Sequence, residues 1–291
     1  MTAQLPPPLP PPIPVPKPYP GFWQAMELSA LWVAVSIAVA VAAAIVDFER
    51  GNRNHEIAMH PAILALASAA ATWSVVLLAR QRTHNGLRQL FAWVPFPPMA
   101  ALAGAGMILS ASMLGALSFL WIERAFPGSI PRLDYGLSRS RWVALLLITV
   151  VAPFSEEILF RGIFLRGFAA RYGIVRGIAL SSLFFACAHG SLVRIPHTLA
   201  LGAVLGSIYV QTRSLWASVG GHMLNNLVAG LVLLLGARQQ SSPDARFAVP
   251  PFQRGELVLA ALCLGIFLLS ANAFPRRDEP AQHSDPPGEA I

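Results

Sequence analysis

Three charged side chains lie close together in a stretch of the chain that is otherwise apolar. Residues 152–162 read A-P-F-S-E-E-I-L-F-R-G, and residues 142–155 carry no charged side chain. In a helix, Glu157 and Arg161 are four residues apart and can pair on one face. Glu156 points about 100° away from Glu157 and needs a different partner. A carboxylate held away from water is a good general base, so Glu156 is a candidate for activating a water molecule.

Two later segments offer further polar side chains at helical spacing. The first is F-F-A-C-A-H-G at 184–190, where Phe185 and His189 are four residues apart. The second is G-G-H-M-L-N-N-L at 220–227, where His222 and Asn226 share one helix face. We expect these groups to converge with Glu156 on one site.

The converging residues predict hydrolysis of a peptide bond. Glu156 and His189 would hold and deprotonate one water, which attacks the peptide carbonyl. His222 and Asn226 would donate hydrogen bonds to the oxyanion that forms. Phe185 is interpreted as a packing residue, and Asn225 is left out of the site because it turns to another face.

A zinc ion is the alternative way to activate the same water. Zinc accepts His and Glu ligands and keeps an open position for water in catalytic sites. Glu156, His189 and His222 would then be the three protein ligands. The residues alone do not decide between the two mechanisms, so no cofactor is assigned and zinc stays open.

The composition predicts an all-α, polytopic membrane protein. Charged residues make up 12% of the 291 residues, against about 25% in soluble domains, and hydrophobic residues make up 55%. A membrane-spanning helix needs about 20 mostly apolar residues. About eight segments meet or approach this requirement: 28–46, 57–79, 89–122 with its helix starting after Pro98, one beginning near Trp142, 177–193, 195–212, 214–237 and 257–275.

The net charge of +7 is interpreted through membrane topology. The arginines fall mostly between the apolar segments, which is typical of lipid headgroup contacts and the positive-inside rule. Arg80, Arg82, Arg88 and the arginines at 166, 171 and 176 follow even-numbered segments, so both termini are expected in the cytoplasm of a cell whose inner membrane holds the chain. A nucleic acid partner is not expected, and the oligomeric state is not indicated.

The chain divides into five parts. Residues 1–24 form a proline-rich tail expected to be disordered, and residues 25–140 hold three membrane helices. The catalytic core is expected at 141–236. Residues 237–275 contain a loop and the last membrane helix, and 276–291 form a second disordered tail. Gly202 and Gly206 form a G-x-x-x-G pattern that lets a neighbouring helix approach closely.

Taken together, the polar motifs resemble those of a known family. The patterns E-E-x-x-x-R at 156–161, F-x-x-x-H at 185–189 and H-x-x-x-N at 222–226 are similar in type and order to the CPBP intramembrane proteases. This family is also called the CAAX prenyl protease and bacteriocin-processing (Abi) group. The resemblance covers residues 141–236 and implies an eight-helix endopeptidase. It implies that Glu156 is the base, His189 the water-holding residue, and His222 with Asn226 the oxyanion support, with Glu157 and Arg161 completing the first motif.

The resemblance also indicates the partners of the chain. They would be the lipid bilayer and a membrane-associated protein, a lipidated protein or a peptide precursor, cleaved as a CAAX protease cleaves its substrates. The family has been described both as metalloproteases and as glutamate-type enzymes. Two other functions remain open at this point: a non-catalytic scaffold or immunity protein that binds a partner in the same cavity, and a transporter or proton relay.

Overall fold

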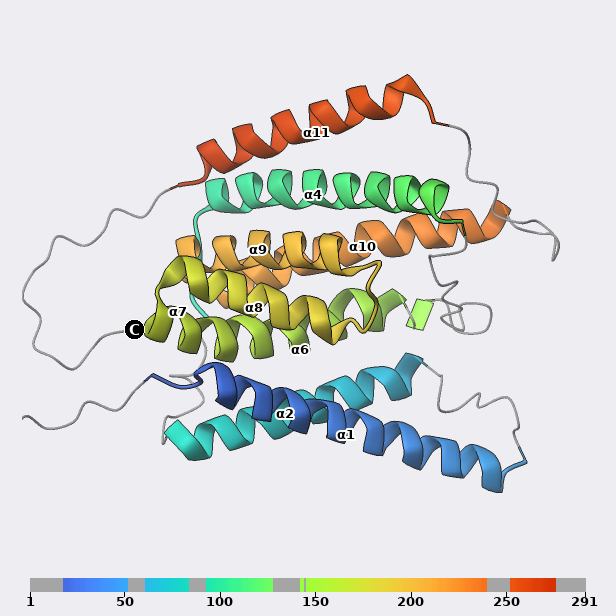
Figure 1. Cartoon of the computed structure of the whole chain (residues 1–291), viewed down its shortest axis with the longest axis vertical. Coiled ribbons are helices and arrows are strands. Elements are labelled where there is room, and N and C mark those ends of the chain that lie inside the picture. Colours follow the sequence, from blue (N-terminus) through green and yellow to red (C-terminus); the bar gives the residue numbers. More distant parts are fainter. Residues whose placement is uncertain are drawn as a thin grey trace, which may run out of the picture.

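The computed structural model describes residues 18–51, 61–83, 93–127, 142–143, 145–239 and 252–275. Within these ranges every regular element is a helix, as the composition predicted. Each of the apolar segments found in the sequence overlaps a helix. Figure 1 shows three layers: an α1–α2 pair, an α4–α11 pair, and the helices α6 to α10 between them.

The first layer is a pair of long helices, α1 (Phe22–Glu49) and α2 (Pro61–Thr83). The proline-rich tail was expected to reach residue 24, but α1 already begins at Phe22. The earlier start has two causes. The backbone N–H of Gly21 donates to Oε1 of Gln24 (2.8 Å), and the N–H of Phe22 donates to the hydroxyl of Tyr172 (3.0 Å). These bonds satisfy donors that a helix N-terminus leaves free. Residues 1–17 and 276–291 lie outside the described part, so disorder of the tails stays a prediction.

The opposite layer pairs α4 (Pro98–Ala125) with α11 (Arg254–Ala273). Helix α4 begins at Pro98, one residue earlier than expected, because proline is tolerated in the first turn. An ion pair joins the two helices near one end. Both carboxylate oxygens of Glu256 accept hydrogen bonds from the guanidinium of Arg124, at 2.6 and 2.7 Å. The indole N–H of Trp121 donates to the same carboxylate at 2.9 Å. This bidentate contact fixes α11 against α4.

The glutamate motif lies on a helical rod in the middle layer that contains two wide turns. Its parts are the π-helix η1 (Leu147–Val151), α6 (Ala152–Glu157), the π-helix η2 (Ile158–Leu165) and α7 (Arg166–Tyr172). All eight residues of η2 are buried. Gly173 ends the rod with φ of 87°, a conformation that side chains with a Cβ rarely adopt. Wide π-type turns are frequent at functional sites.

Three further helices complete the middle layer: α8 (Ile174–Ala188), α9 (Ile195–Thr212) and α10 (Leu215–Gln239). Helices α8 and α9 are separate and packed together, in agreement with the two apolar segments at 177–193 and 195–212. A Cβ built on Gly202 would lie 3.0 Å from Cα of Ser182, and one on Gly206 would lie 3.3 Å from Ile178. The predicted role of these two glycines in close helix packing is therefore confirmed.

The outer faces of the bundle are apolar, which identifies an integral membrane protein. Helices α1, α4 and α11 are long and apolar enough to cross a membrane, and α8 is a shorter apolar helix. Large side chains such as Ile37, Leu102 and Leu269 are more than half exposed. An exposed surface of this kind needs lipid around it. A total of about eight membrane-spanning helices, and the cytoplasmic placement of both termini, stay predictions.

Candidate active site

The centre of the bundle holds a buried ion pair between Glu157 and Arg161. The guanidinium donates to Oε1 of Glu157 at 2.6 Å, and both side chains are 0% exposed. The pairing predicted from their spacing is thus confirmed. Arg161 also donates to the carbonyl of Gly202 on α9 (3.0 Å) and lies over the ring of Phe185, 4.7 Å from its centroid. A buried charge needs such partners, because an unpaired one costs several kcal/mol.

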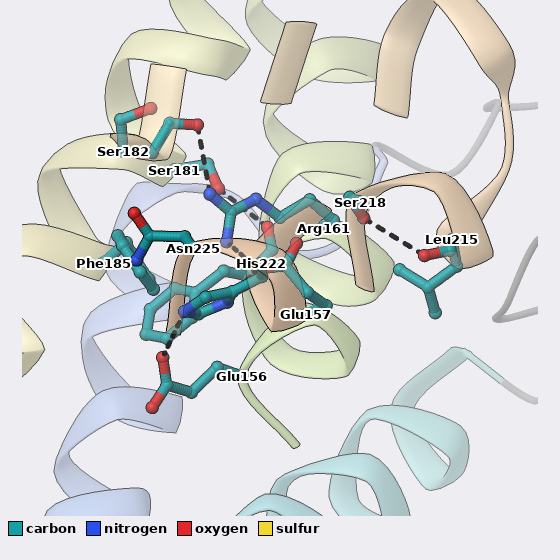
Figure 2. Close-up of polar contacts among 12 residues, drawn as sticks. Glu156, Glu157, Arg161, Ser181, Ser182, Phe185, Leu215, Ser218, His222 and Asn225 are labelled. Atoms are coloured by element: carbon teal, nitrogen blue, oxygen red, sulfur yellow. Dashed lines mark hydrogen bonds and ion pairs between the residues drawn. The ribbon is translucent and has the colours of Figure 1, made fainter. Parts of the chain in front are cut away.

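The same carboxylate oxygen also binds His222 of α10. Nδ1 of His222 lies 2.8 Å from Oε1 of Glu157 (Figure 2). An ionised carboxylate paired with Arg161 can only accept a hydrogen bond, so Nδ1 of His222 carries the proton. This contact fixes the imidazole ring and turns its Nε2 towards Glu156, whose Oε2 is 3.9 Å away. Glu157 therefore orients His222.

The two neighbouring glutamates have different environments. The side chain of Glu157 is 0% exposed, whereas that of Glu156 is 22% exposed. A molecule entering from outside the bundle can reach only the second carboxylate. The sequence predicted a reactive role for Glu156 and a structural role for Glu157, and the difference in exposure agrees with these roles.

His189 ends helix α8 and is oriented by its own helix. Its Nδ1 lies 2.9 Å from the carbonyl oxygen of Phe185. Because a carbonyl only accepts, Nδ1 donates and Nε2 keeps its lone pair for another donor, such as water. The ring of Phe185 contacts the rings of both His189 (4.8 Å) and His222 (5.5 Å). Phe185 is fully buried, as expected for a packing residue.

The expectation that Glu156 and His189 hold one water between them stays a prediction. The imidazole that the structure brings within 3.9 Å of Glu156 is that of His222. The reason is the Glu157 contact, which the sequence could not show because it joins helices 65 residues apart. His222 was expected to be an oxyanion donor or, in the zinc alternative, a metal ligand, and the structure adds its hydrogen bond to Glu157.

Asn226 belongs to a hydrogen-bond chain that includes residues missed in the sequence. Its Nδ2 donates to the carbonyl of Ile148 (3.0 Å), and its Oδ1 accepts from Asn225 (3.0 Å). Asn225 in turn accepts from the hydroxyl of Ser112 on α4 (2.8 Å). Asn225 was left out because helical periodicity points it away from Asn226. Two adjacent amides in an apolar helix were the signal that could have included it.

The donor set does not fit the zinc site considered from the sequence. Within the described residues, no group of three or more His, Cys, Asp or Glu side chains is arranged to hold a metal ion. Nε2 of His222 and Oε2 of Glu156 lie 3.9 Å apart, but His189 does not join them in such a group. The predicted ligands Glu156, His189 and His222 therefore do not form a three-ligand group.

An apolar groove lies on the outer side of the glutamate-bearing rod, between α1, η2 and α8. Two of its lining residues are close in the sequence to residues of the site. Leu159 follows Glu156 by three positions, and Ala188 directly precedes His189. The lining is almost wholly apolar and consists of Phe22, Met26, Ser29, Trp32, Val33, Leu159, Phe160, Leu183, Phe184, Cys187 and Ala188.

The fold and the site define an all-helical membrane protein with ionisable groups held inside the bundle. Such groups usually mark function, because they are costly to insert into a membrane. Residues 138–228 match the model of a protease family described as type II CAAX prenyl endopeptidase Rce1-like. This match contains all three motifs and confirms the resemblance to the CAAX protease group over that segment. A search of curated proteins and a search of solved structures each gave no match.

Proposed function

We propose that the chain is an intramembrane endopeptidase that hydrolyses a peptide bond in membrane-associated, lipidated or precursor peptide substrates, as CAAX proteases do. The observation that carries the proposal is the arrangement of Glu156 and Glu157. Inside the matched segment, a fully buried ion pair orients an imidazole towards a second, partly exposed carboxylate. A merely structural ion pair would not need the second carboxylate.

In the proposed reaction, Glu156 removes one proton from a water molecule. His189 accepts a hydrogen bond from the same water through its free Nε2, and so orients the attacking oxygen. The water oxygen forms a bond to the peptide carbonyl carbon, and the carbonyl π electrons move to its oxygen. When the tetrahedral intermediate collapses, the C–N bond breaks and Glu156 returns its proton to the leaving amine nitrogen.

The oxyanion would be held by two groups of α10. Asn226 uses one N–H for Ile148 and keeps the second for the oxyanion. His222 uses Nδ1–H for Glu157, so it must also carry a proton on Nε2 in order to donate there. With that proton, His222 and Arg161 balance the charges of the two glutamates. One oxyanion donor of this kind is worth roughly 3–4 kcal/mol of transition-state stabilisation.

The surroundings favour this chemistry. Hydrogen bonds and charges act more strongly in a water-poor, low-dielectric site than in bulk water. The apolar groove beside η2 would let a membrane-embedded part of the substrate lie next to the site. A helical bundle in the bilayer thus combines a water-activating carboxylate with access from lipid.

The test is a comparison of protein termini across the proteome of cells expressing the wild type or Glu156→Ala at matched levels. We expect termini that appear only with the wild type and that belong to membrane or lipidated proteins. Glu49→Gln, at an exposed position at the end of α1, is the matched control and should behave as the wild type.

Identical termini in wild-type and Glu156→Ala cells would contradict the proposal. The non-catalytic alternative, a scaffold or immunity protein, would then be favoured if a cellular phenotype survived both Glu156→Ala and His189→Ala. An ion flux in liposomes that depends on Glu156 would instead indicate a proton relay.

A further inference from the structure

A continuous chain of side-chain hydrogen bonds crosses the bundle from α4 to η1. It starts at the hydroxyl of Ser112, which lies 2.8 Å from Oδ1 of Asn225. Nδ2 of Asn225 donates to Oδ1 of Asn226 at 3.0 Å, and Nδ2 of Asn226 donates to the carbonyl of Ile148 at 3.0 Å. Ser112 lies outside the segment that matches the protease family.

Pro153 determines the direction, from donor to acceptor, in which these hydrogen bonds run. In a π-helix each carbonyl accepts from the N–H five residues later, and in η1 the N–H of Ala152 indeed donates to the carbonyl of Leu147. The next carbonyl, that of Ile148, faces position 153, where proline has no N–H. Asn226 supplies the missing donor.

Because a carbonyl can only accept, the Ile148 end fixes the orientation of every amide behind it. Nδ2 of Asn226 must face Ile148, so its Oδ1 faces Asn225. Asn225 must then donate to Asn226, which turns its own Oδ1 towards α4. Only a donor such as the Ser112 hydroxyl fits there. The same hydroxyl also lies 2.8 Å from the carbonyl of Ile108 in its own helix, and its single proton is shared between the two acceptors.

We propose that Ser112 and Asn225 are positioning residues that hold the Asn226 amide with its free N–H available for the oxyanion. This role rests on the proposed peptidase function. Asn225 is buried, 7% exposed, and its amide is therefore unable to exchange its protein partners for bulk water. Without Ser112, the Asn225 amide loses the donor that favours its present orientation. A rotated Asn225 would place an oxygen against Oδ1 of Asn226 and displace it.

The test measures kcat and KM in liposomes, with a reporter peptide that carries a cleaved sequence found in the comparison of termini. Ser112→Ala should lower kcat roughly tenfold and leave KM unchanged, because an oxyanion donor acts in the transition state. Ser112→Thr keeps the hydroxyl and should recover most of kcat. Ser118→Ala is the matched control, since within the described part of the chain the Ser118 hydroxyl donates to its own helix, at the carbonyl of Gly115.

A second measurement does not depend on activity. In protein labelled with ¹⁵N-asparagine, the side-chain amide signals of Asn226, assigned by their loss in Asn226→Asp, should move in Ser112→Ala and stay in place in Ser118→Ala. Unmoved signals together with an unchanged kcat in Ser112→Ala would overturn the positioning role while leaving the peptidase intact. A kcat that falls equally in Ser112→Ala and Ser112→Thr would also overturn it. A wild type that cleaves nothing would instead overturn the proposed function and this role with it.

Discussion

Oε1 of Glu157 accepts hydrogen bonds from both Arg161 and His222, at 2.6 and 2.8 Å. One carboxylate oxygen thus joins a guanidinium on η2 to an imidazole on α10. The first contact neutralises a buried charge, and the second fixes which nitrogen of His222 faces Glu156. The packing of the bundle and the geometry of its candidate active site therefore depend on the same atom.

Glu157→Gln should strongly destabilise the fold, because it leaves the Arg161 guanidinium buried without a counter-ion. Breaking one side of a buried ion pair costs about 3–5 kcal/mol. The free energy of unfolding in a mild detergent, measured by denaturant titration, checks this. The double variant Glu157→Gln/Arg161→Met removes both charges and should be more stable than the single variant. A single variant as stable as the wild type would show that the pair contributes little.

The sequence predicted much of this centre because the signals were local. The pairing of Glu157 with Arg161 follows from helical spacing alone, and the two helices α8 and α9 agree with the two apolar segments at 177–193 and 195–212. The close approach at Gly202 follows from a short motif of small residues. Each of these features involves residues that are neighbours along a helix or at its end.

Contacts between distant helices could not be predicted in the same way. The bond from His222 to Glu157 joins residues 65 positions apart, and that from Ser112 to Asn225 joins residues 113 apart. Periodicity assigns a face to a residue within its own helix, but it does not show which helix lies opposite. The contact of His222 with Glu157 was therefore not predicted, and Asn225 was omitted for the same reason.

Pro153→Ala should reduce the structural importance of Asn226. Alanine restores an N–H at position 153, which can serve the Ile148 carbonyl now bound by the Asn226 side chain. In the wild type, Asn226→Ala leaves the part-buried Ile148 carbonyl without this donor, at a cost of about 1 kcal/mol. In the Pro153→Ala background the same change should cost less. A double-mutant cycle of unfolding free energies measures this coupling, and strictly additive values would contradict it.

Removing divalent metals should leave cleavage unchanged. The predicted ligands do not form a three-ligand group among the described residues. Elemental analysis of the purified protein should find zinc well below one ion per chain. Activity after treatment with 1,10-phenanthroline should match that of untreated protein in the same liposomes. Loss of activity that added zinc restores would show that a metal is essential.

Gly202→Ala should destabilise the bundle at the point where α9 supports the buried arginine. The new methyl group would lie 3.0 Å from both Cα and Cβ of Ser182, so the backbone of α8 would have to move. The carbonyl of Gly202, which accepts from Arg161 at 3.0 Å, would move with α9. Overpacking of this kind costs typically 1–3 kcal/mol.

Gly220→Ala on α10 is the matched control for this change, because its Cβ would meet nothing within 4 Å. Alanine is a better helix former than glycine, so the control should be neutral or slightly stabilising. Thermal unfolding of both variants in the same detergent separates the steric effect of the new methyl group from the effect of helix propensity. Equal melting temperatures for the two variants would mean that α8 yields to the methyl group at no cost. In that case the contact between α8 and α9 would not be what holds the Gly202 carbonyl against Arg161.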